Sequence, residues 1–145
     1  MKKTSSADGI NKVHIWEQAV VHLLNLDGWN LTHTGGGTKS WDAEGYTPKN
    51  KEVVIEMKFR NKHYQEKMIQ LDKYNKLIAT NKTALYFVND PKGNYMFWLN
   101  NLKDLKLIDF YLPYTTLWNS NKLKKPCYLL DESLASVINL NDFKK

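Results

Sequence analysis

Hydrophobic and polar residues repeat along the chain with two periods, which predict its helices and strands. From Val13 to Leu26 the apolar residues recur at helical spacing and predict a helix. Alternating polar and apolar residues then predict three strands: 29–34, 41–46 and 52–59. Residues 47–51, with their Pro and Asn, suit a loop joining the last two strands as a hairpin. One face of the third strand is uniformly apolar and is expected to face the core: Val53, Ile55, Met57 and Phe59.

Helical spacing returns from Tyr64 to Thr80 and predicts a second helix. Apolar runs predict further strands at 83–88, 95–99, 108–112 and 127–130, and residues 132–140 are expected to form a short helix. The order of elements predicts an α/β or α+β fold, a mixed sheet flanked by helices. A chain of 145 residues without a long linker predicts one domain, residues 1–145.

The hairpin brings acidic and basic residues together. If Tyr46 pairs with Glu52 across the loop, Asp42 lies directly opposite Glu56. The Cβ atoms of directly opposed residues are about 4.5–5.5 Å apart, so the two carboxylates share one small volume. Strand alternation places Lys58 on the same face as Glu56.

Two opposed carboxylates repel each other, and a divalent cation removes that cost. Carboxylate oxygens, with waters completing the shell, are the ligands that Mg²⁺ takes. A bound cation and an adjacent lysine are the groups that phosphodiester hydrolysis requires. A Glu-x-Lys pair is also common on solvated strand faces, so the hypothesis needs further support.

Composition favours a polyanionic partner. Lys and Arg number 21 against 15 Asp and Glu, for a net charge of +6 and a pI near 9.3. The single cysteine, Cys127, excludes an internal disulfide and a multi-cysteine metal site, and we expect it half-buried in a strand. The scattered histidines form no His-x-x-x-His zinc motif, and no phosphate-binding glycine motif or Gly-x-Ser-x-Gly elbow is present.

Three further features agree with a nuclease site. Glu17 flanks the apolar stripe of the first helix, and Gln70 and Tyr74 lie one turn apart on the predicted second helix. The glycines at 35–37 precede Asp42 and permit a close approach of the backbone to a nucleic-acid strand. Each feature alone also fits an ordinary helix surface or a plain loop.

Taken together, these residues resemble the PD-(D/E)XK nuclease superfamily. The resemblance covers a core of about residues 13–90 and implies a restriction-endonuclease-like fold, with residues 91–145 as a C-terminal extension that matches no known family. It implies that Asp42 and Glu56 bind Mg²⁺, with Mn²⁺ able to substitute, that Lys58 is the catalytic lysine and that Glu17 is a further acidic residue at the metal. Trp41 stands where the motif often has proline.

The resemblance extends in part to the branches within this superfamily. Gln70 and Tyr74 resemble the Gln-x-x-x-Tyr signature of its recombination exonucleases, where these residues order the active site or the DNA strand. The compact size and the early glutamate resemble archaeal and phage Holliday-junction resolvases, which implies a homodimer.

Basic residues surround the motif and predict DNA contacts. The expected contacts are Lys49, Lys51, Arg60, Lys62, Lys67 and Lys73. A second cluster, Lys122, Lys124 and Lys125, extends this surface or keeps the protein soluble, while Trp98, Tyr111 and Trp118 are expected in the core or a dimer interface.

The sequence thus predicts a metal-dependent endodeoxyribonuclease that cuts duplex or branched DNA. Two alternatives stay open, namely a catalytically silent DNA-binding or assembly subunit of the same fold, and a DNA exonuclease. The N-terminus lacks the apolar stretch of a signal peptide, and no apolar run reaches membrane-spanning length. We therefore expect a cytoplasmic protein of a bacterial, archaeal or phage-infected cell.

Overall fold

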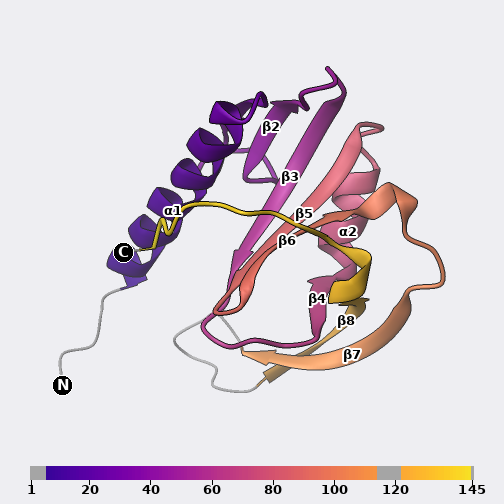
Figure 1. Cartoon of the computed structure of the whole chain (residues 1–145). Coiled ribbons are helices and arrows are strands. Elements are labelled where there is room, and N and C mark those ends of the chain that lie inside the picture. The colour runs from indigo at the N-terminus through magenta and orange to yellow at the C-terminus, as the bar shows by residue number, and fades with distance from the viewer. Residues whose placement is uncertain (1–5, 114–121, 145) are drawn as a thin grey trace.

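A computed structural model describes residues 6–113 and 122–144, and Figure 1 shows its arrangement. The two α-helices of this part of the chain are α1 (Ser6–Leu26) and α2 (Leu71–Ile78). Its strands are β1 (Asn30–His33), β2 (Ala43–Tyr46), β3 (Glu52–Phe59), β4 (Glu66–Gln70), β5 (Thr83–Asp90), β6 (Gly93–Trp98), β7 (Lys106–Pro113), β8 (Lys122–Asp131) and β9 (Ser136–Val137). Two short 3-10 turns, η1 (Leu99–Asn101) and η2 (Glu132–Leu134), complete the elements.

The strands form two sheets. Six of the described strands form a mixed sheet in the order β1-β2-β3-β5-β6-β9, in which β3 and β5 run parallel and the other neighbours antiparallel. The other three form an antiparallel sheet in the order β4-β8-β7. The predicted mixed α/β architecture is confirmed. Strands β6 and β9, from the C-terminal third of the chain, complete the main sheet.

The main sheet is covered on both faces (Figure 1). On one face α1 packs through Val20 and Leu24 against Val53 and Ile55 of β3, so the predicted core face is confirmed. The opposite face is buried as well, because α2, β4 and β8 cover it with a second apolar cluster: Leu77, Ile69 and Leu130. A strand in such a position holds buried residues on both sides.

The hairpin register follows the prediction. Tyr46 pairs with Glu52 and Ala43 pairs with Ile55. The loop between them is closed by hydrogen bonds from Thr47 N to Lys51 O (2.9 Å) and from Asn50 N to Thr47 O (2.8 Å). The short loop therefore fixes the register that carries the acidic residues.

Two predicted helices are wrong in part. Residues 64–80 contain strand β4 before α2, because alternate residues Lys67 and Ile69 are buried and the segment pairs with β8. Residues 132–140 form the 3-10 turn η2 and strand β9, whose Ser136 pairs with Met96. In both places pairing with a distant strand overrides the local helical spacing.

The C-terminal segment returns to α1, as Figure 1 shows. Ile138 and Leu140 pack against the apolar cluster under α1, and the Phe143 ring lies 6.0 Å from that of Phe59. The Lys144 ammonium lies 4.6 Å from the centre of the Trp16 ring, at cation–π distance. The last described residues therefore complete the layer that the first helix begins.

We expect Gly45→Ala to destabilise the protein by about 3 kcal/mol. Gly45 lies in β2 between two paired strands with φ +149°, and an added Cβ would overlap the carbonyl oxygen of Asn30. Urea denaturation measures the effect. Gly93→Ala is the matched control, because a Cβ there meets no atom closer than 3.8 Å. Equal stability of the two variants would contradict the expected clash.

Candidate active site

The central feature is a pair of carboxylates at the edge of β2 and in the middle of β3. Asp42 directly precedes β2, and its backbone N–H donates to Ile55 O (2.9 Å). Its Oδ2 accepts a hydrogen bond from Met57 N (2.8 Å), which fixes the carboxylate beside β3. Glu56 is only 5% exposed. The structure thus brings Asp42 and Glu56 together, as the register predicted.

The environment of Glu56 favours its protonated form. Burial and, next, the negative charge of Asp42 raise its pKa to about 8. The positive charges of Lys73 and Lys58 offset part of this increase. An ionised Glu56 at this buried position therefore lowers the free energy of unfolding unless a further cation lies nearby.

Two lysines approach this pair from different elements. Lys58 is exposed and follows Glu56 by two residues on β3, so it projects from the same face of the strand. Lys73 comes from α2, where its Nζ lies 3.8 Å from Glu56 Oε1 and donates to Ser40 O (2.8 Å). The sequence analysis expected Lys73 to contact DNA and did not place it beside Glu56. Its closeness to Glu56 results from the packing of α2.

Glu17 reaches the same region from α1. Its side chain is buried, and its Oε1 lies 2.8 Å from His33 Nε2. Burial raises the pKa of Glu17, the hydrogen bond with His33 lowers it, and the nearby charge of Asp42 raises it. The ring of His14 packs edge-on against that of His33, at 5.9 Å between centroids. His33 is a partner of Glu17 that the sequence did not indicate; only its alternation with Leu31 in the first strand placed it on a defined face.

The glycine loop, residues 34–41, passes over these side chains. Thr34 N and Gly35 N both donate to Asp42 O, at 2.8 and 3.1 Å, and Thr34 Oγ1 donates to Trp41 O (2.7 Å). A Cβ at Gly35 would overlap the Glu17 carboxylate, so only glycine fits there. These bonds join the two ends of the loop to each other, and Gly35 lies against the Glu17 carboxylate.

Gln70 and Tyr74 are placed differently from the prediction. Gln70 ends β4, opposite Cys127, and directly precedes α2, so the two residues do not share a helix face. The Tyr74 ring packs against that of Tyr128, at 4.9 Å between centroids, and burial raises the pKa of Tyr74. The expectation of a helical Gln-x-x-x-Tyr pair is corrected, because β4 occupies the first half of the segment. Cys127 itself is fully buried, deeper than predicted.

Of the predicted DNA contacts, Lys49, Lys51 and Lys62 are exposed and Arg60 is half-buried. Lys67 is only 4% exposed, and its ammonium bonds to Asp90 Oδ2 and Glu132 Oε2, both at 3.0 Å. The expectation that Lys67 contacts nucleic acid is therefore corrected, since its charge is neutralised in the interior.

Only some of the other predicted aromatic and basic residues lie in the part of the chain that the structure describes. Trp98 packs against Trp29 at the edge of the core, with ring centroids 6.4 Å apart. Lys124 is exposed and Lys125 half-buried. Trp118 and the side chains of Tyr111 and Lys122 lie outside the described residues.

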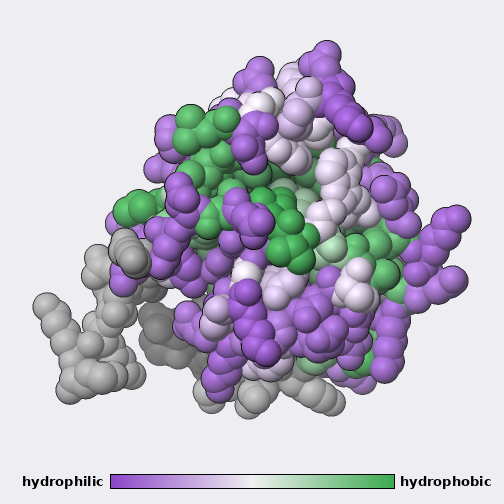
Figure 2. Space-filling view, viewed as in Figure 1, coloured by the Kyte–Doolittle hydropathy of each residue, from purple (hydrophilic) through white to green (hydrophobic). Residues whose placement is uncertain are grey.

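On the face seen in Figure 2, hydrophilic residues cover most of the lower part, where β7 and β8 lie, and apolar patches lie mainly higher. Exposed apolar residues on α1 include Ile15 and Leu26. No helix in the described part of the chain is long and apolar enough to cross a membrane.

The acidic side chains at this site offer oxygen donors for a metal ion. Within residues 6–113 and 122–144, no three His, Cys, Asp or Glu side chains are grouped closely enough to hold a metal by themselves. The Asp42–Glu56 pair offers two oxygen donors, and burial together with the charge of Asp42 raises the pKa of Glu56, so a further cation would stabilise its ionised form. Two carboxylates with waters suit Mg²⁺, which commonly keeps several waters in proteins. The residues present therefore fit a hydrated divalent cation.

No protein-family model and no curated protein matches the chain. Among solved structures it is similar to Hjc, a Holliday junction resolvase from the archaeal hyperthermophile Archaeoglobus fulgidus. The TM-score is 0.55 at 15% sequence identity, over 84% of this chain and 88% of that chain. The two proteins share a fold. At this identity the likeness concerns the fold alone.

Proposed function

We propose that the chain is a divalent-metal-dependent endodeoxyribonuclease with Asp42, Glu56 and Lys58 at its active centre. The observation that carries the proposal is the carboxylate pair, in which a buried Glu56 lies beside Asp42 with its pKa raised to about 8. A stability cost of this kind at a defined position is typical of a functional site. The shared fold with a Holliday junction resolvase supports a nuclease.

In the proposed reaction each residue has a separate task. Asp42 and Glu56 hold Mg²⁺ or Mn²⁺, which when bound activates water and offsets charge on the phosphate. Lys58, exposed beside Glu56, orients the attacking water or stabilises the developing negative charge. Met57 N–H keeps the Asp42 carboxylate in place, and Lys73 does the same for Glu56. Glu17, held by His33, adds negative charge on the Asp42 side.

Branched or junction DNA is the substrate that we propose, with a homodimer as the acting species. The support is the fold shared with a junction resolvase, and the fact that a two-fold substrate favours a two-fold protein. The net charge of +6 and the exposed Lys49, Lys51 and Lys62 supply attraction for the phosphate backbone.

One observation favours a second candidate, a catalytically silent DNA-binding subunit. Lys73 already lies 3.8 Å from Glu56 and supplies positive charge without a metal. In this alternative the acidic residues and Lys73 form a structural ion pair. The exonuclease alternative draws on a helical Gln70–Tyr74 pair, whereas Gln70 ends β4 and directly precedes α2, which holds Tyr74.

Cleavage of three labelled substrates tests the proposal: a supercoiled circle, a linear duplex and a four-way junction. Each is incubated with Mg²⁺, Mn²⁺ or EDTA. We expect metal-dependent cutting, strongest on the junction. Cutting of circles excludes an exonuclease. Binding without cutting of any substrate in either metal would favour the silent subunit and overturn the nuclease.

A further inference from the structure

A cavity lies between the main sheet and the smaller sheet, apart from the carboxylate pair. It has a volume of about 670 Å³, within the range of roughly 300–1,000 Å³ usual for small-molecule sites. Its lining comes from the segment after β3 and from β4, β5, β7 and β8, and it includes Arg60, Lys62, Tyr64, Tyr86, Val88 and Phe110. Nothing in the proposed cleavage reaction uses this space.

The cavity shares a sheet face with the carboxylate pair. Its wall residues Tyr86 and Val88 lie in β5, in register with Glu56 and Lys58 of the neighbouring parallel strand β3. Neighbouring strands are about 4.8 Å apart, and residues at matching positions project from the same face. A DNA strand with its phosphate at Lys58 therefore has the cavity one strand away.

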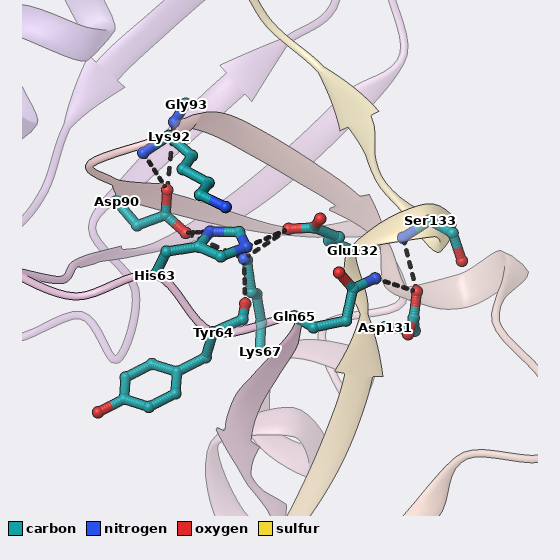
Figure 3. A network of polar contacts seen from close by, with 10 residues as sticks. All are labelled: His63, Tyr64, Gln65, Lys67, Asp90, Lys92, Gly93, Asp131, Glu132 and Ser133. Atoms are coloured by element: carbon teal, nitrogen blue, oxygen red, sulfur yellow. Dashed lines mark hydrogen bonds and ion pairs between the residues drawn. The ribbon is translucent and has the colours of Figure 1, made fainter.

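A polar network holds one wall of the cavity in place (Figure 3). His63 Nδ1 lies 2.7 Å from Asp90 Oδ2, and its Nε2 lies 3.3 Å from Glu132 Oε2. The Lys67 ammonium bonds both carboxylates and also donates to the backbone oxygen of Tyr64. The network joins the start of β4, the end of β5 and η2, so the wall is fixed by buried charge pairs.

Two acidic groups of the cavity lining are already bonded to other groups of the protein. Asp90 is occupied by Lys67 and His63, and Asp131 accepts hydrogen bonds from Gln65 (3.1 Å) and Ser133 N (2.9 Å). Two basic residues also line the cavity: Arg60 is half-buried and Lys62 is exposed. Tyr64 is 58% exposed, and Figure 3 shows its ring pointing away from the network. Aromatic and apolar surface thus adjoins positive charge.

We propose that this cavity takes up one unpaired nucleotide of the DNA strand next to the phosphate that is cut. The base packs against the aromatic side chains of Tyr64 and Phe110, and the phosphate lies at Arg60 and Lys62. Aromatic rings stack on any base, and adjacent cations bind the backbone. The proposal rests on the proposed function for DNA as the ligand. In this proposal the protein recognises DNA in part by a base that is not paired.

Binding without metal tests this proposal independently of cleavage. The probes are two fluorescent duplexes of equal length, one fully paired and one with a single unpaired adenine, measured by anisotropy in EDTA. We expect the parent to prefer the duplex with the unpaired base. Tyr64→Ala should reduce this preference at least about fivefold, the equivalent of one lost base–aromatic stack. The Tyr64 backbone oxygen that accepts from Lys67 remains in this variant.

Tyr46→Ala is the matched control, because Tyr46 is 40% exposed on β2 and does not line the cavity. Phe110→Leu tests the second ring and should also reduce the preference. Equal binding of both duplexes by the parent, or a preference that Tyr64→Ala leaves unchanged, overturns the cavity proposal alone. Absence of binding to either duplex would remove DNA as the ligand, and the proposed function with it. A preference in a parent that cuts no DNA would overturn only the nuclease.

Discussion

Replacing Lys58 by alanine is expected to lower metal-dependent DNA cleavage by about 100- to 1,000-fold. Lys58 is the exposed ammonium beside the buried Glu56, and in the proposed reaction it acts on water or on the developing charge. Initial cleavage rates of the preferred substrate, at saturating Mg²⁺, measure the effect. Binding of the same substrate in EDTA should change little, because one phosphate contact is a small part of the total.

Lys76→Ala is the matched control for this experiment. Lys76 is also exposed and its loss changes the net charge equally, but it lies in the last turn of α2. The control should cleave at the parent rate. Comparable cleavage by the Lys58 variant and the control would contradict the active centre proposed here. Asp42→Asn provides a second variant, which should abolish cutting by removing one of the two carboxylates proposed to hold the cation.

Replacing Glu56 by glutamine should stabilise the metal-free protein at pH 8 by a few kcal/mol. The pKa of Glu56 is about 8 in the folded protein and near 4.5 in the unfolded chain. A raised carboxyl pKa means that folding takes up a proton between these values, so stability falls as pH rises from about 4.5 to 8. Glutamine does not ionise and removes this loss.

Thermal unfolding in EDTA from pH 5 to 8 measures the difference. The melting temperature of the parent should fall over this range, and that of Glu56→Gln should fall less. Burial also raises the pKa of Glu17, which leaves a smaller slope of the same sign. The lowered pKa values of Asp90 and Asp131 affect stability only at more acidic pH, because their contribution is lost as pH falls below the unfolded values.

Glu52→Gln is the control, since Glu52 begins the same strand but its side chain is half exposed. It should keep the slope of the parent. Mg²⁺ at pH 8 should raise the melting temperature of the parent and of the control, and should have little effect on Glu56→Gln. A parent that melts at the same temperature from pH 5 to 8 would contradict the assigned ionisation, and one that does not respond to Mg²⁺ would support the silent subunit.

The Asp42–Glu56 pair could be predicted from the sequence because it depends only on the local structure of one hairpin. The alternation in residues 52–59 and the short loop before them are sufficient to align Tyr46 with Glu52. That alignment places Asp42 beside Glu56 without any knowledge of distant contacts. The first helix and strands β3, β5 and β6 were predicted for the same reason, since their periodicity is strong and agrees with their packing.

The remaining features depend on contacts between residues far apart in the chain. Residues 66–70 have helical spacing, but hydrogen bonds to β8, about sixty residues later, make them a strand. The burial of Lys67 follows from the same pairing, which brings Glu132 to its ammonium. The His33–Glu17 contact likewise depends on how α1 crosses the sheet. Local patterns contain no information about such partners.

The β2–β3 hairpin and the smaller sheet also differ in what substitutions within them can change. Asp42, Glu56 and Lys58 are carried by a single hairpin whose register a short loop sets. The cavity wall also draws residues from β7 and β8 of the smaller sheet, in which β8 pairs with β4 and with β7 and neither strand pairs with the hairpin. Substitutions in β7 and β8 can therefore reshape the cavity while the carboxylates keep their positions. A change of ligand preference can therefore arise from substitutions in β7 and β8, such as at Phe110, without any change at Asp42, Glu56 or Lys58.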